Sequence, residues 1–432
     1  MKINNLLSLL IILTLIFLIP TGEKVFAQNN NKAQIDSVKE LLIDENYDES
    51  IKLLNNILKE DSSDVDAYFY LGICFRAVSD FPKSADVLSK ALKYKPGDLK
   101  IMISLGNDLI ASGRFSEAKE VLSRALLQDS VNSSILNSLG NVLMQKHEWN
   151  QGLKIYNNLI KNDSTKSCYY VQAAKCSAIL EDTSSAIVDY QIALKLNPQN
   201  EQTIINLSRL YYLKKKFISA ARIIDNGLAV YPYSPEMWLM KGKILAGMKD
   251  YKNAINSYSN SVAYGDSSLM NFRDLGMCYY YTGMFDTAIV CLESAVKIED
   301  NDPASYFYLG TSYKGLKKYE LAIENLTVAA GLLKNDILAE IYTQLGSSYY
   351  SNKEYRKALD AYRDAYKEKP DKFEINFYLA VVYDHYYKDK TVAMNYYKKF
   401  LMDSSKTDLK LVNYAADRLD YLIEDNFMNS GE

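Results

Sequence analysis

Histidine and cysteine are scarce in this sequence of 432 residues, which contains two histidines and five cysteines. His147 and His385 lie far apart, each at an expected solvated turn, and no group of His and Cys has the spacing of metal ligands. A Gly-rich phosphate-binding loop and the motif of a nucleophile elbow are also missing. These absences predict a protein with no enzymatic activity, no metal and no other cofactor.

A surplus of positive charge is lacking as well. The formal net charge is −3, and charged residues make up 24% of the chain. Nucleic-acid binding proteins need clustered cations to neutralise phosphates, often with aromatic side chains between them. The short runs Lys214–Lys216 and Lys398–Lys399 instead resemble solvated helix faces. We therefore expect no nucleic-acid partner.

Proline and glycine are few, with 8 and 18 residues, whereas hydrophobic residues make up 48% of the chain. This composition suits a folded, mostly helical protein and excludes bulk disorder. Tyrosine is the residue in excess, with 36 copies against 14 phenylalanines and 2 tryptophans.

Long apolar runs are confined to the first residues. Lys2 precedes the apolar run Leu6–Ile19. Val25 and Ala27 then supply the residues at positions −3 and −1 of a signal-peptidase site, which would be cut before Gln28. The pattern predicts a cleavable signal peptide over residues 1–27, a short linker over 28–33, and export to a periplasm, a cell envelope or the medium. An uncleaved anchor is the alternative, but the run is shorter than the roughly 20 residues that span a bilayer. No transmembrane segment is expected after cleavage.

An internal repeat organises the rest of the chain, and Ile341–Pro370 is its cleanest copy. Each unit is numbered so that the glycine of its Leu-Gly pair is position 8. The residues at position 8 are Gly72, Gly106, Gly140, Ala174, Ser208, Gly242, Gly276, Gly310, Gly346 and Ala380. Their spacing is 34 residues, except for 36 between Gly310 and Gly346. A small residue at this position lets the two helices of one hairpin approach closely. The extra residues are expected within 331–336, and one further residue within 385–390.

The repeat resembles the tetratricopeptide repeat family over about residues 34–405, in eleven units. An amphipathic capping helix is expected over 406–428, followed by a short tail at 429–432. The resemblance implies an all-α, right-handed superhelical solenoid whose first helices line a concave groove. It also implies that one or more proteins or peptides bind in that groove.

Cysteines sort by their position in the repeat. Cys74, Cys176 and Cys278 share position 10, and Cys291 occupies position 23. Both positions take small residues that pack in the core, so the pattern predicts buried thiols instead of a disulfide framework. Cys168, at position 2, is the one expected to be exposed.

Position 9 is expected to face the groove in five consecutive units. Its residues are Asn107, Asn141, Lys175, Arg209 and Lys243. Asn amides can bond an extended peptide backbone, and the cations can hold a carboxylate. The resemblance implies such a role, because tetratricopeptide domains that clamp a terminal carboxylate use Asn and Lys or Arg at this position. A merely solvated inner face is the alternative.

Aromatic residues are expected along the groove at positions 5, 12 and 13. They are Tyr212, Tyr280, Tyr281, Phe307, Tyr350 and Phe377, of which Tyr212, Tyr280 and Tyr350 are the candidate binding residues. Tyrosines give contact surface at low entropy cost and can also stack on sugar rings. The alternative is that they shield the core.

The sequence thus predicts a non-enzymatic scaffold or adaptor of the periplasm or cell envelope that binds segments of partner proteins. An exported glycan- or peptide-binding receptor that uses the tyrosine-rich C-terminal half is the first alternative. An accessory subunit of an envelope enzyme complex is the second.

Overall fold

The structure is a computed structural model that describes residues 33–333, 337–402 and 408–429. The predicted signal peptide at 1–27 lies outside the described residues. Throughout the described ranges, the regular secondary structure is helical and no strand occurs. A helix at 33–43 pairs with α2, and ten further pairs run from α3 with α4 to α21 with α22, which makes eleven. The predicted all-α repeat solenoid of about eleven units is therefore confirmed.

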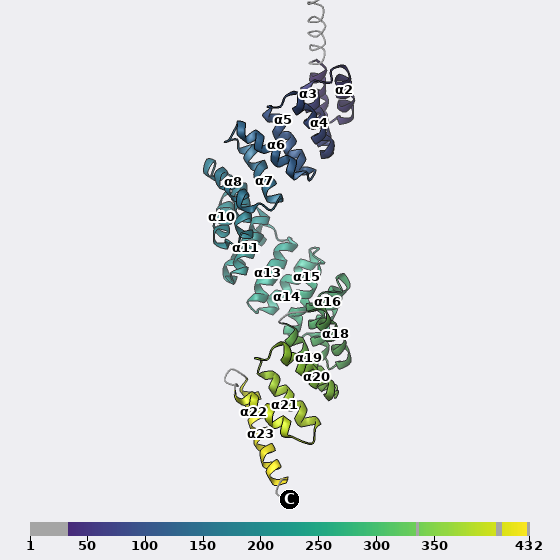
Figure 1. Ribbon diagram of the computed structural model, residues 1–432, viewed down its shortest axis with the longest axis vertical. Coiled ribbons are helices and arrows are strands. Elements are labelled where there is room, and N and C mark those ends of the chain that lie inside the picture. Colours follow the sequence, from purple (N-terminus) through teal and green to yellow (C-terminus); the bar gives the residue numbers. More distant parts are fainter. Residues whose placement is uncertain (1–32, 334–336, 403–407, 430–432) are drawn as a thin grey trace, which may run out of the picture. The chain divides into compact units, whose positions relative to one another are not determined.

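The chain divides after Pro198 into two compact units, and each consists of consecutive helical hairpins (Figure 1). After the helix at 33–43, the first unit contains α2 (Tyr47–Glu60), α3 (Val65–Ala77), α4 (Phe81–Tyr94), α5 (Leu99–Ala111), α6 (Phe115–Gln128), α7 (Ser133–Gln145), α8 (Trp149–Asn162), α9 (Ser167–Ile179) and α10 (Thr183–Leu196).

The second unit begins with α11 and ends with a helix that has no hairpin partner. It contains α11 (Glu201–Leu213), α12 (Phe217–Val230), α13 (Pro235–Gly247), α14 (Tyr251–Ala263), α15 (Leu269–Tyr281), α16 (Phe285–Ile298), α17 (Pro303–Gly315), α18 (Tyr319–Leu332), α19 (Leu338–Ser351), α20 (Tyr355–Glu368), α21 (Glu374–Tyr386), α22 (Thr391–Met402) and α23 (Leu409–Asn429).

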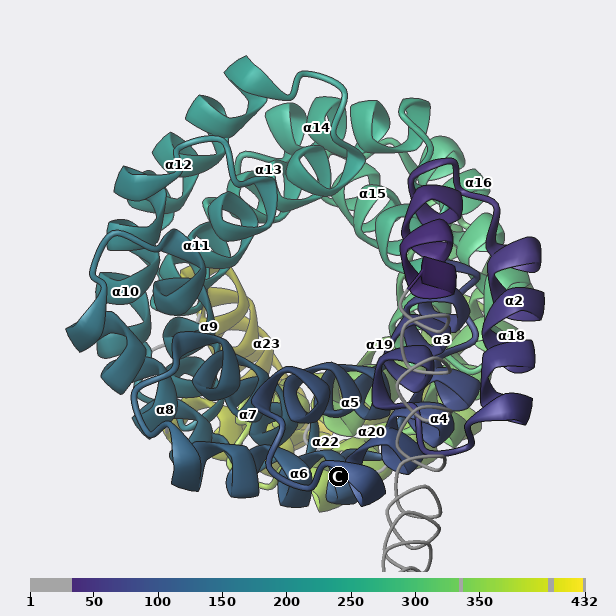
Figure 2. The ribbon, with the colours of Figure 1, turned by 90° about the horizontal axis from the view of Figure 1, so that it is seen from above.

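Each unit has two layers of helices, seen end-on in Figure 2. The odd-numbered helices, such as α5 and α7 in the first unit and α11 and α13 in the second, lie on the inner side. The even-numbered helices lie on the outer side. Neighbouring odd-numbered helices contact one another directly, as α11 does with α13. The inner surface of each unit is therefore built from the first helices of its hairpins.

Close approach of the two helices in each hairpin depends on position 8. A Cβ atom added to Gly106 would lie 2.6 Å from Leu122 Cγ, and one added to Gly276 would lie 2.6 Å from Leu292 Cγ. These distances are shorter than real Cβ contacts, so the residue at position 24 occupies the space that a side chain would need. The structure confirms why small residues recur at position 8.

The turn inside each hairpin uses a left-handed backbone at position 15. The residues with positive φ at this position are Glu45, Ser79, Gly113, His147, Glu181, Lys215, Lys249, Gly283, Lys317 and Lys353. The following amide bonds back to the helix, as Glu148 N–H does to the Leu143 carbonyl at 2.8 Å. This is the Schellman arrangement of a helix C-terminus. It confirms that His147 is a turn residue.

The last hairpin turns differently. Tyr387 follows α21 with an extended backbone, and residues 387–390 form the connection to α22. His385 therefore lies in the final turn of α21, and the prediction that it lies at the bend itself is wrong. The additional residue of this unit lengthens the connection, which removes the left-handed turn.

The two additional residues between Gly310 and Gly346 are divided between a helix and its connection. α19 has 14 residues, whereas α17 has 13. The connection from α18 to α19 covers 333–337, whereas that from α16 to α17 covers 299–302, so it is one residue longer. Part of the predicted segment, 334–336, lies outside the described residues.

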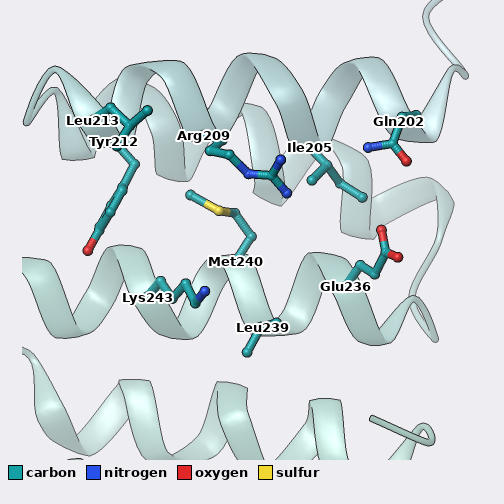
Figure 3. Close-up of a pocket in the computed structure, with 9 residues that line it drawn as sticks. All are labelled: Gln202, Ile205, Arg209, Tyr212, Leu213, Glu236, Leu239, Met240 and Lys243. Atoms are coloured by element: carbon teal, nitrogen blue, oxygen red, sulfur yellow. The ribbon is translucent and has the colours of Figure 1, made fainter. Parts of the chain in front are cut away.

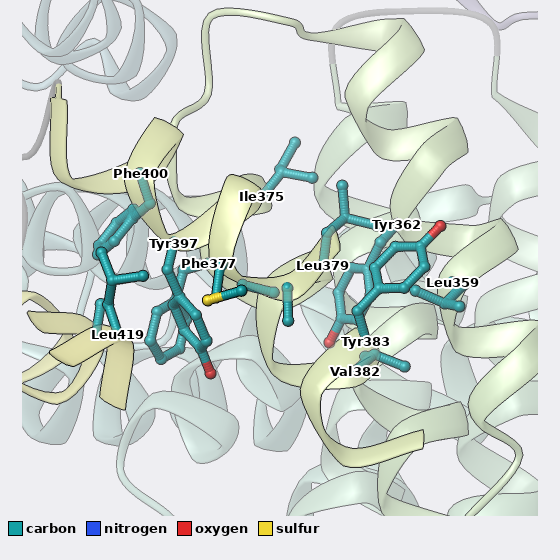
Figure 4. Close-up of a cluster of buried hydrophobic side chains, with 14 of the residues drawn as sticks. Leu359, Tyr362, Ile375, Phe377, Leu379, Val382, Tyr383, Tyr397, Phe400 and Leu419 are labelled. Atoms are coloured by element: carbon teal, nitrogen blue, oxygen red, sulfur yellow. The ribbon is translucent and has the colours of Figure 1, made fainter. Parts of the chain in front are cut away.

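A cluster of buried aromatic and aliphatic side chains joins the last hairpin to α23 (Figure 4). Phe377 is 7% exposed, and its ring centroid lies 5.3 Å from that of Phe400 and 5.8 Å from that of Tyr414. The prediction that Phe377 faces the groove is therefore wrong. Because α23 covers the last hairpin, position 5 there is buried as core.

A buried ion pair also attaches α23 to that hairpin. Arg418 donates from Nε to Asp384 Oδ2 at 2.7 Å and from its second amino group to Oδ1 at 3.0 Å. Burial alone would raise the pKa of the Asp384 carboxyl, but Arg418 and Lys390 hold it below its ordinary value. Two parallel charge-assisted hydrogen bonds fix the direction of the capping helix.

Gly310→Ala tests the close approach at position 8. The new Cβ would lie 2.8 Å from Leu326 Cγ and 3.1 Å from the Ala322 carbonyl oxygen, which belongs to the backbone. We expect a loss of about 1–3 kcal/mol in the free energy of unfolding, measured by urea denaturation followed by circular dichroism. Gly331→Ala is the matched control, because nothing lies within 4 Å of its added Cβ. It should be neutral or stabilising by up to about 1 kcal/mol. Equal effects would contradict the packing argument.

Arg418→Met tests the ion pair of the cap. We expect a loss of about 1–3 kcal/mol at neutral pH, because Asp384 loses two charge-assisted hydrogen bonds. The folded pKa of Asp384 is lowered, so its contribution is complete above the unfolded pKa of about 3.9 and disappears as the pH falls through the folded value. The stability difference between the wild type and the variant should therefore shrink at pH 3. Thermal unfolding at both pH values measures it, and a difference that grows at pH 3 would contradict the assignment.

Candidate ligand-binding groove

A cavity of about 470 Å³ opens on the inner side of the second unit, between α11 and α13 (Figure 3). We call it the α11–α13 cavity. Its lining residues are Gln202, Ile205, Arg209, Tyr212, Leu213, Glu236, Leu239, Met240 and Lys243. They occupy positions 2, 5, 9, 12 and 13 of α11 and positions 2, 5, 6 and 9 of α13. Residues at these spacings share one face of a helix, so the repeat itself directs them to the same side.

Two cations share this cavity, as Figure 3 shows. Arg209 is exposed and Lys243 is half-buried. Neither has an ion-pair partner within 4.0 Å in the described part of the chain. Burial is the main cause that lowers the pKa of Lys243; Asp274 opposes it, while Arg273 and Arg209 add to the lowering. An anion bound between the two side chains would relieve this repulsion.

The rest of the lining is apolar except at one end. Figure 3 shows Gln202 and Glu236 together at the end away from Tyr212 and Leu213. Glu236 is the one carboxylate in the lining, and among the described residues it has no ion-pair partner within 4.0 Å. The cavity is therefore polarised, with cations in the middle and a carboxylate at one end.

The structure brings three of the predicted binding residues into this cavity: Arg209, Tyr212 and Lys243. One face of Tyr212 packs against α12, because its ring centroid lies 5.7 Å from that of Phe217. Gln202, Glu236 and Met240 were not predicted. Position 2 could have revealed the first two, because the same position was expected to expose Cys168, which the structure confirms.

Three other predicted residues belong to the first unit. Asn107 Oδ1 accepts a hydrogen bond from the Ser138 hydroxyl at 2.7 Å, and Asn141 Oδ1 accepts one from the Tyr156 hydroxyl at 2.7 Å. Both amide oxygens thus serve contacts within the protein, and their NH₂ groups remain as donors toward a ligand. Lys175 is half-buried on α9.

Tyr280 lies in a cluster of aromatic rings on α14 to α17. Its ring centroid lies 5.6 Å from that of Tyr308 and 5.9 Å from that of Phe285. Its neighbour Tyr281 stacks on Tyr251 at 4.6 Å. Ring packing of this kind holds Tyr280 half-buried, and burial raises the pKa of its hydroxyl.

Tyr350 has a similar environment near the end of the unit. Its ring centroid lies 5.6 Å from that of Tyr355 and 5.9 Å from that of His385. Stacking of a sugar requires a free aromatic face, whereas the rings of Tyr280 and Tyr350 each contact other aromatic rings of the protein. The geometry therefore supports the peptide alternative more than the glycan alternative.

Burial of the cysteines follows the predicted frame. Cys74, Cys176 and Cys278 are buried, Cys291 is partly buried, and all are free thiols. Burial raises the pKa of Cys176 to about 11 and that of Cys278 to about 12. These thiols pack as small apolar groups.

Within the described ranges, no group of three or more His, Cys, Asp or Glu side chains could hold a metal ion. No helix there is both long and apolar enough to cross a membrane.

Hairpins stacked in two layers define a helical-repeat protein, and its second unit has a polarised cavity on the inner layer. Family models described as tetratricopeptide repeat match residues 37–98, 75–139, 235–263, 274–302 and 343–398. The chain belongs to the tetratricopeptide repeat family. Proteins of this family are scaffolds that bind other proteins and are generally not enzymes.

Two similar proteins are longer than this chain and are named as members of protein complexes. BBSome complex member BBS4 of Bos taurus is 22% identical over 196 residues, which are 45% of this chain and 37% of that protein. Anaphase-promoting complex subunit 3 of Schizosaccharomyces pombe is 22% identical over 239 residues, which are 55% of this chain and 35% of that protein. The chain therefore spans little more than a third of the length of these relatives.

Two solved structures match most of this chain at low sequence identity. The APC/C hetero-tetramer Cut9–Hcn1 matches with a TM-score of 0.47 and 15% identity, covering 88% of this chain and 95% of that one. Yeast Tom70 matches with a TM-score of 0.38 and 14% identity, covering 91% of this chain and 96% of that one.

Proposed function

We propose that the protein is a non-enzymatic scaffold of the periplasm or cell envelope, and that its α11–α13 cavity binds an acidic, extended segment of a partner protein. The observation that carries this proposal is the pair Arg209 and Lys243, which share one cavity without an acidic partner. A carboxylate between them would accept charge-assisted hydrogen bonds from both.

The size and lining of the cavity suit a short stretch of peptide. Its volume of about 470 Å³ lies within the range of ligand sites in proteins. Ile205 and Met240 are buried beneath it and offer an apolar surface for one side chain of the ligand. Methionine adapts to side chains of different shape, which suits a scaffold with more than one partner.

Glu236 gives the bound segment a direction. It lies seven residues before Lys243 on α13, about 10 Å along the helix axis. An extended peptide covers that distance in about three residues. The preferred ligand thus carries an acidic group opposite Arg209 and Lys243 and a basic side chain or a free backbone donor about three residues away.

Export is supported by the sequence pattern of residues 1–27. A charged start, an apolar run and small residues before a cut are the parts of a secretory signal. An exported scaffold of this composition would act on other envelope proteins.

Photo-crosslinking tests the binding site. A benzophenone residue in place of Leu213, at the rim of the cavity, should attach to partner segments that mass spectrometry can identify. We expect these segments to carry Asp, Glu or a terminal carboxylate. In fluorescence anisotropy, R209E/K243E should weaken the binding of a synthetic copy of such a segment by about 100-fold or more, because each of the two lost contacts to a charged group costs about 1.5–3 kcal/mol.

Lys175→Glu is the control, because it removes a cation of the same repeat position outside the cavity. It should leave binding unchanged, and circular dichroism should show equal helicity for all variants. Equal binding by R209E/K243E would exclude the α11–α13 cavity as the site.

Intact-mass measurement of the exported protein tests the signal peptide. We expect the mature chain to begin at Gln28, because small residues end at Ala27. Ala27→Arg should block the cut and leave the longer chain associated with the membrane. A wild-type chain that keeps residues 1–27 would identify an anchor instead.

A further inference from the structure

A second cavity, of about 460 Å³, lies in the first unit between α2 and α4. We call it the α2–α4 cavity. Its walls come from two helices of the outer layer, and Tyr68, Leu71 and Phe75 of α3 form its floor, so it opens on the side opposite the inner surface. Leu58 and Val87 complete an apolar lining. This cavity takes no part in the proposed peptide binding.

Positive charge surrounds the α2–α4 cavity. Lys59 on α2 and Lys90 on α4 are exposed, and within the described ranges neither has an ion-pair partner inside 4.0 Å. Lys83 also lines the cavity and pairs with Asp80. Asp86 is the one acid in the lining, and Arg114 at 2.9 Å already neutralises it. The rim is therefore basic around an apolar floor.

The outward face of α23 has the opposite character. Tyr421 is 55% exposed on this face, whereas the ring of Tyr414 packs against Phe377 of the last hairpin. Asp420 and Glu424 lie beside Tyr421, both exposed and without an ion pair in the described part of the chain. Asp417 and Asp425 are exposed beside them.

The other face of α23 packs against the last hairpin, α21 and α22. Ala415, Leu419 and Leu422 are buried there, and Arg418 holds Asp384. The inward side of the capping helix is thus covered within the chain, whereas Tyr421 stays exposed on the acidic outward side. A polar outer face would suffice for a cap whose sole task was solubility.

We propose that the protein associates head to tail, with the acidic, tyrosine-bearing face of α23 of one copy docked in the basic α2–α4 cavity of a second copy. Tyr421 would contact the floor formed by Tyr68, Leu71 and Phe75. The acids at 420 and 424 would lie against Lys59 and Lys90. Such a contact uses different surfaces on the two partners, so each added copy leaves a free cavity and a free helix.

Charge reversal with rescue tests the proposal. The purified wild-type chain should form oligomers that grow with concentration in sedimentation velocity runs and dissociate as salt is raised. K59E/K90E and D420K/E424K should each weaken association by about tenfold or more, since each variant places like charges against one another. The chain that carries all four substitutions should associate again, because the signs are exchanged on both surfaces.

Folding and ligand binding are controlled separately. All variants should keep the helicity of the wild type, and recovery of association in the fourfold variant excludes misfolding as the cause of its loss. R209E/K243E should associate like the wild type, so this result does not depend on the peptide site. A wild type that stays monomeric, a single reversal that still associates, or a fourfold variant that does not recover would each overturn the proposal. Binding of an acidic helix from another protein by a monomeric wild type would assign the cavity to that partner instead.

Discussion

The close approach of two helices at position 8 is the contact on which this structure depends. Where glycine is absent, the replacement still fits the narrow space: the Ser208 hydroxyl donates to the Ala220 carbonyl at 3.1 Å across its hairpin. The Ser84 hydroxyl makes the corresponding contact with the Gly72 carbonyl from the other side, at 2.8 Å. Close packing of the two helices restricts the angle at which they cross, so successive hairpins repeat the same geometry. Equal hairpins then present equal positions to the inner surface.

The α11–α13 cavity is a consequence of this regularity. Arg209 and Lys243 hold the same position in consecutive hairpins. The repeat therefore places two like charges side by side, although they repel each other. Burial and the nearby cations lower the pKa of Lys243, and a carboxylate beside it would raise that pKa again. Binding of such an anion would thus relieve the repulsion between two adjacent hairpins.

Sequence alone predicted the elements that follow the 34-residue period. The small residue at position 8 and the buried cysteines at position 10 are local consequences of the period, and the structure agrees with both. The left-handed turn residue could not be predicted from the sequence, because Glu45, His147 and Lys353 share no chemistry that favours positive φ. The closure of the hairpin imposes that conformation on whichever residue stands there.

Other differences arise from contacts between hairpins, which a period cannot express. Phe377 occupies a groove position by its number, but α23 packs over the last hairpin and makes the position core. Tyr280 and Tyr350 occupy groove positions by number, but their rings pack against aromatic residues of neighbouring helices. The partners of a side chain depend on which rotamers fit the next unit, and this is decided in three dimensions.

The ends of a repeat protein pose a problem that its middle does not. Every internal hairpin is covered on both sides by copies of itself, whereas the first and last hairpins each have one uncovered side. Here α23 covers the last one with Leu419 and Leu422 and exposes Tyr421 on its own far side. The apolar floor between α2 and α4 lies on the outer side of the first two hairpins and not at the end of the stack. The capping helix at the end of one copy can therefore dock on the side of another copy, with charge selecting the partner where shape alone would accept any apolar helix.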